Sequence, residues 1–336
     1  MLRGVIRCPA EELRRFGTAV VARMGAAPDD AAFVADVVVA SDLAGHESHG
    51  MRRLPEYVER WRGGRLDPAA RPVVELDTGA VVRLNGRNGF GHVAVRDQTD
   101  LAVTRAREHG VAAIALRRAN HAGRYADFCE RAAAAGAAIL FLVNDAGGEQ
   151  DVAPPGGLEP RLATNPIAAG VPRTGSPHLV LDMATSVIAR GRLAEWSDRN
   201  EPIPTEWVTP TGAIRPAAGY KGFGLALVVE ALAGALTGAG TVSARPEHDD
   251  QGVLAIAIDV ARLRPLDGFA REVDAMLDYV RGVPLEAGAE PVRAPGESGA
   301  RTAAERAVAG VPVQPFTWAR LRRLARELDV PAPEPL

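Results

Sequence analysis

Hydrophobic positions near the N-terminus recur at the spacing of an α-helix. One side of a helix predicted over residues 9–24 carries Leu13, Phe16, Val20 and Met24. The turn Pro28-Asp29-Asp30, with a capping carboxylate, is expected to precede a second helix that runs into Gly45. We therefore expect the first 70 or so residues to be mostly helical.

Short apolar runs alternate with helical patterns in the middle of the chain. Segments 73–76 and 80–84, separated by Asp77-Thr78-Gly79, predict a β-hairpin. Further strands are predicted at 111–116, 137–143, 178–183 and 253–258, and helices at 92–108, 123–135 and 222–237. This alternation is typical of an α/β fold with a sheet.

Helical patterns return near the C-terminus, at 267–281, 301–309 and 316–328, and the tail 331–335 is expected to fray. Helical segments at both ends of an α/β middle suggest one discontinuous helical domain. We expect it to comprise residues 1–70 plus 265–336, around an α/β domain at 71–264.

Composition narrows the classes of protein that fit. The 336 residues are 47% hydrophobic and 24% charged, with a net charge of -3, as in soluble globular proteins. No basic excess points to nucleic acid or an anionic membrane, and no apolar run predicts a signal peptide or a membrane span. The two cysteines, Cys8 and Cys129, lie far apart and predict no disulfide framework, so the cytoplasm is the expected compartment.

Candidate chemistry concentrates in two short segments that follow helical or strand patterns. The first contains Ser48, His49, Arg53 and Tyr57, and the second is Asn120-His121-Ala122-Gly123. Arginine matches a carboxylate with two parallel hydrogen bonds, and histidine gains and loses a proton near neutral pH. A carboxylate clamp beside a proton donor suits the reduction of a 2-oxo acid.

Familiar nucleotide-binding motifs are missing from the sequence. No GxGxxG and no GxxxxGK[ST] occurs. Gly219-Tyr220-Lys221-Gly222 can be a tight turn that opens a helix, or a helix N-terminus whose lysine favours an anion. Spacing alone supports both interpretations equally.

Seven short motifs in order resemble the malate/L-lactate dehydrogenase family, which does not use the Rossmann fold. Its relatives include ureidoglycolate dehydrogenase, sulfolactate dehydrogenase, diketogulonate reductase and piperideine-2-carboxylate reductase. The matching stretches are Ser48-His49-Gly50 with Arg53 and Tyr57, Asn120–Gly123, Pro155–Gly157, Ala163–Pro166, Asp182–Ser186, Tyr220–Gly224 and Pro295–Glu297. The resemblance spans about residues 9 to 310.

The resemblance implies a two-domain homodimer that uses NAD or NADP to reduce a small 2-oxo or 2-imino acid, and the reverse reaction. Its active site would lie near the subunit boundary, and the α/β domain would bind the cofactor in a non-Rossmann, mixed sheet. His121 resembles the proton-transfer group, and Ser48, His49, Arg53 and Tyr57 resemble the substrate-side residues. The cofactor contacts carried over by motif are Asn144, Asn165, Asp182, Met183, Ala184, Lys221, Gly296, Glu297 and Ser298.

The chain departs from many relatives of that family at Ala122, where they carry Phe. Two of its segments are also shorter than is common in the family, one between Trp196 and Gly219 and one between Val242 and Gln251. These departures bear on substrate identity. Arg245 is not assigned the substrate-binding role that an arginine of the second segment has in some relatives.

Three alternatives stay open at this point. One is a reductase of a cyclic 2-imino acid, one is a metal-assisted hydrolase or lyase built on His46, His49 and His121, and one is an inactive binding homologue. The histidine spacing fits neither HExxH nor a CxxC pair, so we expect no metal site. For single residues a purely structural role is also open: Arg53 could be a surface charge, Tyr57 could only pack its ring, and Asp182 could cap a turn.

Overall fold

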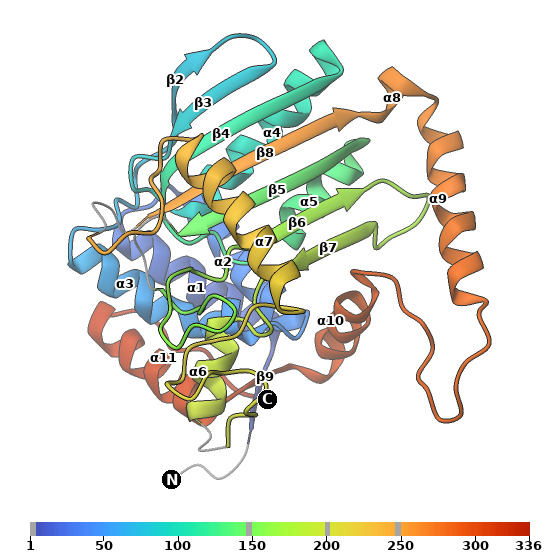
Figure 1. The fold of residues 1–336 in the computed structure, drawn as a ribbon. Coiled ribbons are helices and arrows are strands. Elements are labelled where there is room, and N and C mark those ends of the chain that lie inside the picture. Colours follow the sequence, from blue (N-terminus) through green and yellow to red (C-terminus); the bar gives the residue numbers. More distant parts are fainter. Residues whose placement is uncertain (1–4, 146–149, 199–201, 246–249) are drawn as a thin grey trace.

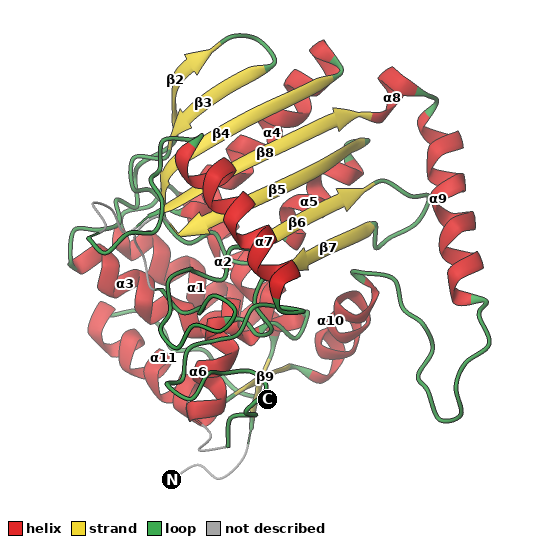
Figure 2. Ribbon diagram, in the orientation of Figure 1, coloured by secondary structure: helices red, strands yellow, loops and turns green. Residues whose placement is uncertain are grey.

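The computed structural model describes residues 5–145, 150–198, 202–245 and 250–336. A seven-stranded sheet lies beside a group of helices built from both ends of the chain (Figure 1). The predicted α/β fold with a mixed sheet and helices from both termini is confirmed. Figure 2 shows how the strands gather on one side and the terminal helices on the other.

The helical group forms around one apolar core. It contains α1 (Ala10–Met24), α2 (Pro28–Leu43), α3 (Leu54–Arg62) and α11 (Pro315–Leu328). Leu13, Phe16 and Val20 of α1 are buried there beside Trp318 and Leu321 of α11. Burial of these stripes, rather than local preference, holds segments together that are 300 residues apart.

Two expectations for this region are wrong. Pro28 is the first residue of α2, and Asp30 caps nothing, because its carboxylate binds Arg71 at 2.8 Å and Arg96 at 3.0 Å. The C-terminal tail does not fray either. Strands β1 (Ile6–Cys8) and β9 (Val311–Val313) pair, and the backbone N–H of Leu336 donates to the carbonyl of Arg7 at 2.9 Å.

The large sheet has the order β2-β3-β4-β8-β5-β6-β7. Only β3 and β4 run parallel, and the other neighbours are antiparallel. Its strands are β2 (Val73–Asp77), β3 (Val81–Asn85), β4 (Val111–Ala119), β5 (Ala137–Asp145), β6 (Ile167–Val171), β7 (Leu179–Met183) and β8 (Gln251–Asp259). The hairpin and the four other predicted strands are present. The sequence pattern missed β6, a five-residue run of small and apolar residues.

Helices cover the two faces of the sheet unequally (Figure 1). Helices α4 (Gly91–His109) and α5 (Ala126–Ala134) pack on one face, where Ile114, Leu116 and Phe141 are fully buried. On the other face lies α7 (Tyr220–Val229), which continues as a π-helical turn over Glu230–Ala235. The alternation along β4 therefore separates a sealed face from a more open one.

The remaining helices are α6 (Arg190–Asp198), α8 (Val260–Leu263), α9 (Leu266–Arg281) and α10 (Glu297–Ala309). Helix α9 stands at the end of the sheet (Figure 1), where Val273 and Leu277 pack with Val171 and Leu179. The division into a helical domain and a cofactor-binding domain stays a prediction.

Candidate active site

His121 and Tyr57 meet where the sheet adjoins the helical group. His121 follows the end of β4, and Tyr57 lies on α3. The hydroxyl of Tyr57 is 2.7 Å from Nδ1 of His121, and the backbone N–H of Gly123 donates to the same nitrogen at 3.3 Å. A hydroxyl can donate to Nδ1 or accept from it, so the pair survives a change of protonation at His121.

The surroundings of His121 keep its ring neutral. Burial, and then the charge of Arg53, lower the pKa of His121 well below its ordinary value. Burial also raises the pKa of Tyr57, so the phenol stays protonated. The site therefore holds a neutral imidazole beside a neutral hydroxyl.

The Ser48-His49 segment forms two 3-10 turns, η1 (Glu47–His49) and η2 (Met51–Arg53). Ser48 Oγ lies 2.9 Å from Nδ1 of His49, and the His49 ring stacks on His121 with centroids 5.5 Å apart. Gly50 is required between the turns, because a Cβ there would lie 1.9 Å from Oδ1 of Asp42. Burial, and then Arg53, lower the pKa of His49 to about 3.

Two hydrogen bonds hold the guanidinium of Arg53 in place. Its Nε donates to the carbonyl oxygen of Ser48 at 2.7 Å, and its NH1 donates to Glu56 at 2.6 Å. The side chain is 21% exposed. A planar fork anchored in this way can present its remaining N–H groups to a substrate carboxylate.

Asn120 belongs to the motif that carries His121, but the sequence analysis assigned it no role of its own. Its buried amide donates to the carbonyl oxygens of Arg65, Asn88 and Gly89, at 3.2, 2.8 and 3.2 Å. Its own oxygen accepts a hydrogen bond from Arg60 at 2.7 Å. Asn120 thereby ties the end of β4 to three backbone segments and fixes the position of the next residue, His121. Its place immediately before the histidine was the available signal.

Several of the expected cofactor contacts gather around β7. Asp182 and Met183 end this strand, and Ala184 follows. The turn before α10 lies alongside, since the N–H of Val180 donates to the carbonyl of Pro295 at 3.2 Å. Gly222, next to Lys221, packs so tightly on the carbonyl of Thr185 that a Cβ would lie 2.4 Å from it. These contacts bring Met183, Ala184, Lys221 and Gly296 into one region.

Within this region not every side chain is available to a ligand. Asp182 accepts a hydrogen bond from the backbone N–H of Ala126 at 2.9 Å, at the start of α5. Burial raises the pKa of Asp182 to about 6. Glu297 contacts Arg281 and accepts from the N–H of Ala294 at 2.8 Å. Lys221 is exposed at the start of α7, and Ser298 is exposed on α10.

Asn144 and Asn165 belong to a buried network around Glu230. The amide of Asn165 donates to Glu230 at 2.9 Å, and the amide of Asn144 donates to the carbonyl of Gly240 at 2.9 Å. The N–H of Gly252 donates to Asn144 at 3.1 Å. Both asparagines are 1% exposed, so their side chains position the strand ends and the π-helical turn.

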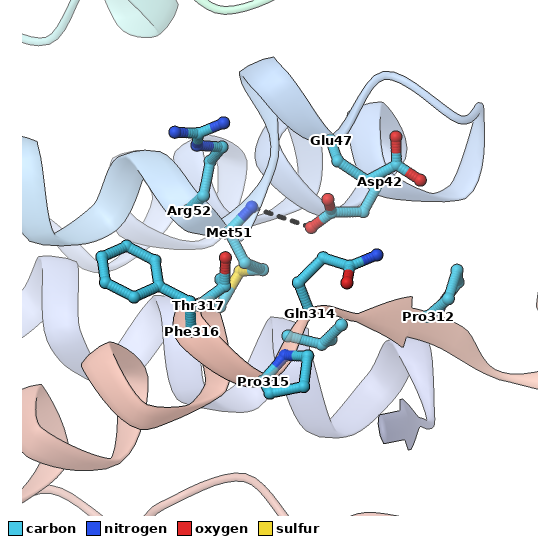
Figure 3. A pocket seen from close by; sticks show the side chains of 10 residues that line it. Asp42, Glu47, Met51, Arg52, Pro312, Gln314, Pro315, Phe316 and Thr317 are labelled. Carbon is cyan, nitrogen blue, oxygen red and sulfur yellow. Dashed lines mark hydrogen bonds between the residues drawn. The ribbon is translucent and has the colours of Figure 1, made fainter. Parts of the chain in front are cut away.

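A cavity of about 260 Å³ lies beside the turns that carry Ser48 and Arg53, near the start of α11 (Figure 3). It is lined by Asp42, Glu47, Met51, Arg52, Pro312, Val313, Gln314, Pro315, Phe316 and Thr317. None of the residues expected to touch substrate or cofactor lines it. The candidate chemistry is therefore separate from this cavity.

Across residues 5–145, 150–198, 202–245 and 250–336, no three His, Cys, Asp or Glu side chains come together in a way that could hold a metal ion. Along the same stretches of chain, every helix is too short or too polar to cross a bilayer.

Comparison with known proteins assigns the family. A model of the malate/L-lactate dehydrogenase family matches residues 8–322. This chain belongs to the malate/L-lactate dehydrogenase family. It is therefore a dehydrogenase-family enzyme, and the resemblance read from its motifs is confirmed.

Relatives of this malate/L-lactate dehydrogenase family member carry different substrate names. An L-lactate dehydrogenase of Cupriavidus necator is 35% identical over 95% of this chain and 97% of its own. An L-sulfolactate dehydrogenase of Methanothermobacter thermautotrophicus is 32% identical over 97% and 98%. The structure of malate dehydrogenase from Pyrococcus horikoshii superposes with a TM-score of 0.89 at 30% identity, covering 98% of this chain and 97% of that one.

Proposed function

We propose that this enzyme catalyses NAD(P)-dependent hydride transfer to and from C2 of a small 2-oxo or 2-hydroxy acid, with His121 as the proton-transfer group. The observation that carries the proposal is the cluster of Tyr57, His121 and Arg53. His121 can carry a proton, Tyr57 hydrogen-bonds it, and the anchored guanidinium of Arg53 lies close enough to affect its pKa. Family membership supports the same reaction class.

Arg53 would bind the substrate carboxylate and set its orientation. Ser48 and Glu56 each accept one hydrogen bond from the guanidinium, so its remaining N–H groups are fixed in direction before the substrate arrives. His49 stacks on His121 and hydrogen-bonds Ser48. Its ring would therefore border the bound substrate beside His121. The substrate would then present its C2 oxygen to His121.

Substrate binding itself would change the proton affinity of His121. After burial, Arg53 is the largest cause of the lowered pKa of His121. A bound carboxylate offsets that positive charge, so the pKa of His121 rises when the substrate binds. In reduction the protonated ring would hydrogen-bond the C2 oxygen and deliver the proton, while Nδ1–H donates to Tyr57. In oxidation the neutral ring would accept the proton of the hydroxyl.

The residues around β7 fit a dinucleotide. Two glycines shape the backbone there: a Cβ on Gly222 would lie 2.4 Å from the carbonyl oxygen of Thr185, and Gly296 takes φ 97°. Lys221 at the start of α7 adds a positive charge where the helix N-terminus also favours an anion. When bound, the nicotinamide supplies or receives the hydride, and Met183, Ala184 and Lys221 would hold the cofactor around β7. Asp182 and the Gly296–Ser298 turn would shape that site.

A second copy of this chain is the proposed partner. Exposed apolar side chains gather on and after α7, on the more open face of the sheet, at Leu225, Leu227, Val228 and Leu236. Patches of this kind mark protein interfaces. Light scattering on purified protein tests the homodimer, and a monomer at micromolar concentration contradicts it.

The reaction is tested by following reduced nicotinamide absorbance with NADH and with NADPH. The substrates are pyruvate, oxaloacetate, sulfopyruvate and a cyclic 2-imino acid. We expect turnover of at least one 2-oxo acid and a large loss in His121→Ala. Absence of turnover with every 2-oxo acid and both cofactors would contradict the proposed function.

A further inference from the structure

A buried carboxylate, that of Glu230, lies in the π-helical turn that continues α7. Glu230 is only 5% exposed. One of its oxygens accepts a hydrogen bond from the amide of Asn165 at 2.9 Å, and the other accepts from the amide of Asn144 at 3.4 Å and from the backbone N–H of Val242 at 3.1 Å. A carboxylate is costly to bury unless it is hydrogen-bonded, so these N–H groups are what allow Glu230 to lie inside the protein.

The amide of Asn165 also connects the π-helical turn to α7. It donates a second hydrogen bond, to the carbonyl oxygen of Ala226 at 3.1 Å. Because Glu230 and this carbonyl are both acceptors, the NH2 group of the amide must face them. Asn165 takes a φ of 38°, in a region that asparagine enters more readily than most residues. The last turn of α7 is thereby attached to the segment just before β6.

The first turn of α7 is attached to the same segment through Thr185, which is 2% exposed. The carbonyl oxygen of Thr164 accepts hydrogen bonds from the N–H and from the hydroxyl of Thr185, both at 2.9 Å. The carbonyl oxygen of Thr185 in turn accepts from the N–H of Ala217 at 2.9 Å, and Gly222 packs against it. Since Thr185 directly follows Ala184, one hydrogen-bonded unit holds both ends of α7 beside the end of β7.

We propose that Glu230 is a positioning residue for cofactor binding, because its carboxylate fixes α7, and with it Lys221, relative to Met183 and Ala184. This inference rests on the proposed function, which places the cofactor around β7. Glu230 is too deeply buried to touch a dinucleotide, so it acts through the helix. Without its contacts α7 is held less firmly at its far end, and Lys221 is in place in a smaller fraction of the molecules. The apparent affinity for the cofactor falls with that fraction.

Glu230→Gln is the variant that tests this role, because it keeps the shape of the side chain. A glutamine replaces one acceptor by a donor, which would then face the N–H groups of Asn165, or those of Asn144 and Val242. Fluorescence titration with NADH and with NADPH should show a Kd raised by about tenfold, as expected for losing a hydrogen bond to a charged group. At saturating cofactor, kcat and the KM for the 2-oxo acid should change less than about twofold.

Thr237→Val is the matched control for a loss of stability alone. The hydroxyl of Thr237 is fully buried and donates to the carbonyl oxygen of Ala233 in the same π-helical turn at 2.6 Å. Its hydrogen bonds stay within residues 233–239, so removing them does not disturb the amide of Asn165. This variant should lower the melting temperature and leave the Kd for the cofactor unchanged.

Asn165→Gly removes the contact with Glu230 from its other side, and glycine readily keeps the positive φ. It should raise the Kd for the cofactor as Glu230→Gln does. The two residues act as one unit, so the double variant should bind the cofactor about as well as either single variant. Melting temperatures verify that each variant is folded at the temperature of the titration.

Three outcomes overturn the inference while the proposed function stands. The Kd for the cofactor could be unchanged in Glu230→Gln or, where that variant does not fold, in Asn165→Gly. It could rise equally in Thr237→Val, which would make the effect one of general stability. The two substitutions could also act independently in the double variant. Failure of the proposed function looks different, since the wild type itself would then bind neither NADH nor NADPH, and both proposals would fall together.

Discussion

The hydroxyl of Tyr57 lies 2.7 Å from Nδ1 of His121, although 64 residues separate them in the chain. The contact joins α3 of the helical group to the end of β4 of the sheet. It gives the proposed proton carrier a partner that can either donate or accept. The site is therefore assembled across the boundary between the two parts of the molecule.

Replacing Tyr57 with Phe should lower kcat by about tenfold, the usual consequence of losing one hydrogen bond of about 1.5 kcal/mol. The ring that packs against Phe90 and His92 is retained, so stability should change little. Steady-state rates with saturating cofactor measure the effect. An unchanged kcat in Tyr57→Phe would show that the hydroxyl only fills space.

His121→Ala should lower kcat by about two to four decades, the span expected for losing a general acid. Affinity for the cofactor should stay nearly unchanged, because the proposed cofactor region lies around β7. His109→Ala is the control, since His109 ends α4 and its side chain is 41% exposed. Turnover near the wild-type value in His121→Ala would remove this histidine from the mechanism.

Arg53→Lys should lower kcat/KM for the 2-oxo acid by about ten- to one-hundredfold while keeping the charge. A lysine ammonium cannot hold Ser48 and Glu56 and also present a planar fork to a carboxylate. Arg52→Lys is the matched control, because an ammonium can still donate to the carbonyl of Gly191. Equal effects of the two substitutions would mean that Arg53 is not the clamp.

The buried His92 predicts how stability depends on pH. Burial lowers the pKa of His92 in the folded protein to about 3, and unfolding returns it to about 6.5. Below about pH 6.5 the unfolded chain binds a proton that the folded chain does not, so stability falls as the pH falls. Between about pH 7.5 and about pH 5.5 this one residue accounts for about 1.4 kcal/mol of lost stability.

His92→Phe removes that contribution while keeping an aromatic ring in place. Urea unfolding at the two pH values should therefore show a pH-dependent loss that is smaller by about 1.4 kcal/mol in the variant. The same loss in both proteins would mean that His92 is protonated, or solvated, in the folded state.

Lys221→Ala should raise the Kd for the reduced cofactor, with a salt-sensitive loss of binding. Lys221 is the only lysine in the chain, so an amine-selective reagent offers a second measurement. Bound cofactor should protect Lys221 from modification, as peptide mass analysis can show. An unchanged Kd for both NADH and NADPH, with no protection, would place the cofactor phosphates elsewhere.

Local patterns in the sequence were sufficient for most of the elements and for the family. Helical spacing and strand alternation predicted α1, α4, α9, the hairpin and the core strands, because these signals arise from neighbours a few residues apart. The Asn120–Gly123 motif located His121 between a strand and a helix. The helix itself begins at Ala126, three residues later than expected, since Gly123 takes φ 79° and Asp182 binds the N–H of Ala126.

Tertiary structure alone decided which side chains meet. Tyr57 pairs with His121, Asn144 and Asn165 hydrogen-bond the buried Glu230, and Gly191 packs against Ser48 and Arg53. Each of these contacts depends on how distant segments pack together, and the burial of apolar faces sets that packing. The sequence around the contact residues carries no periodic pattern from which their partners could be predicted. The sequence by itself determined most of the elements, the family and the chemical groups, and the packing of distant segments determined which of those groups meet.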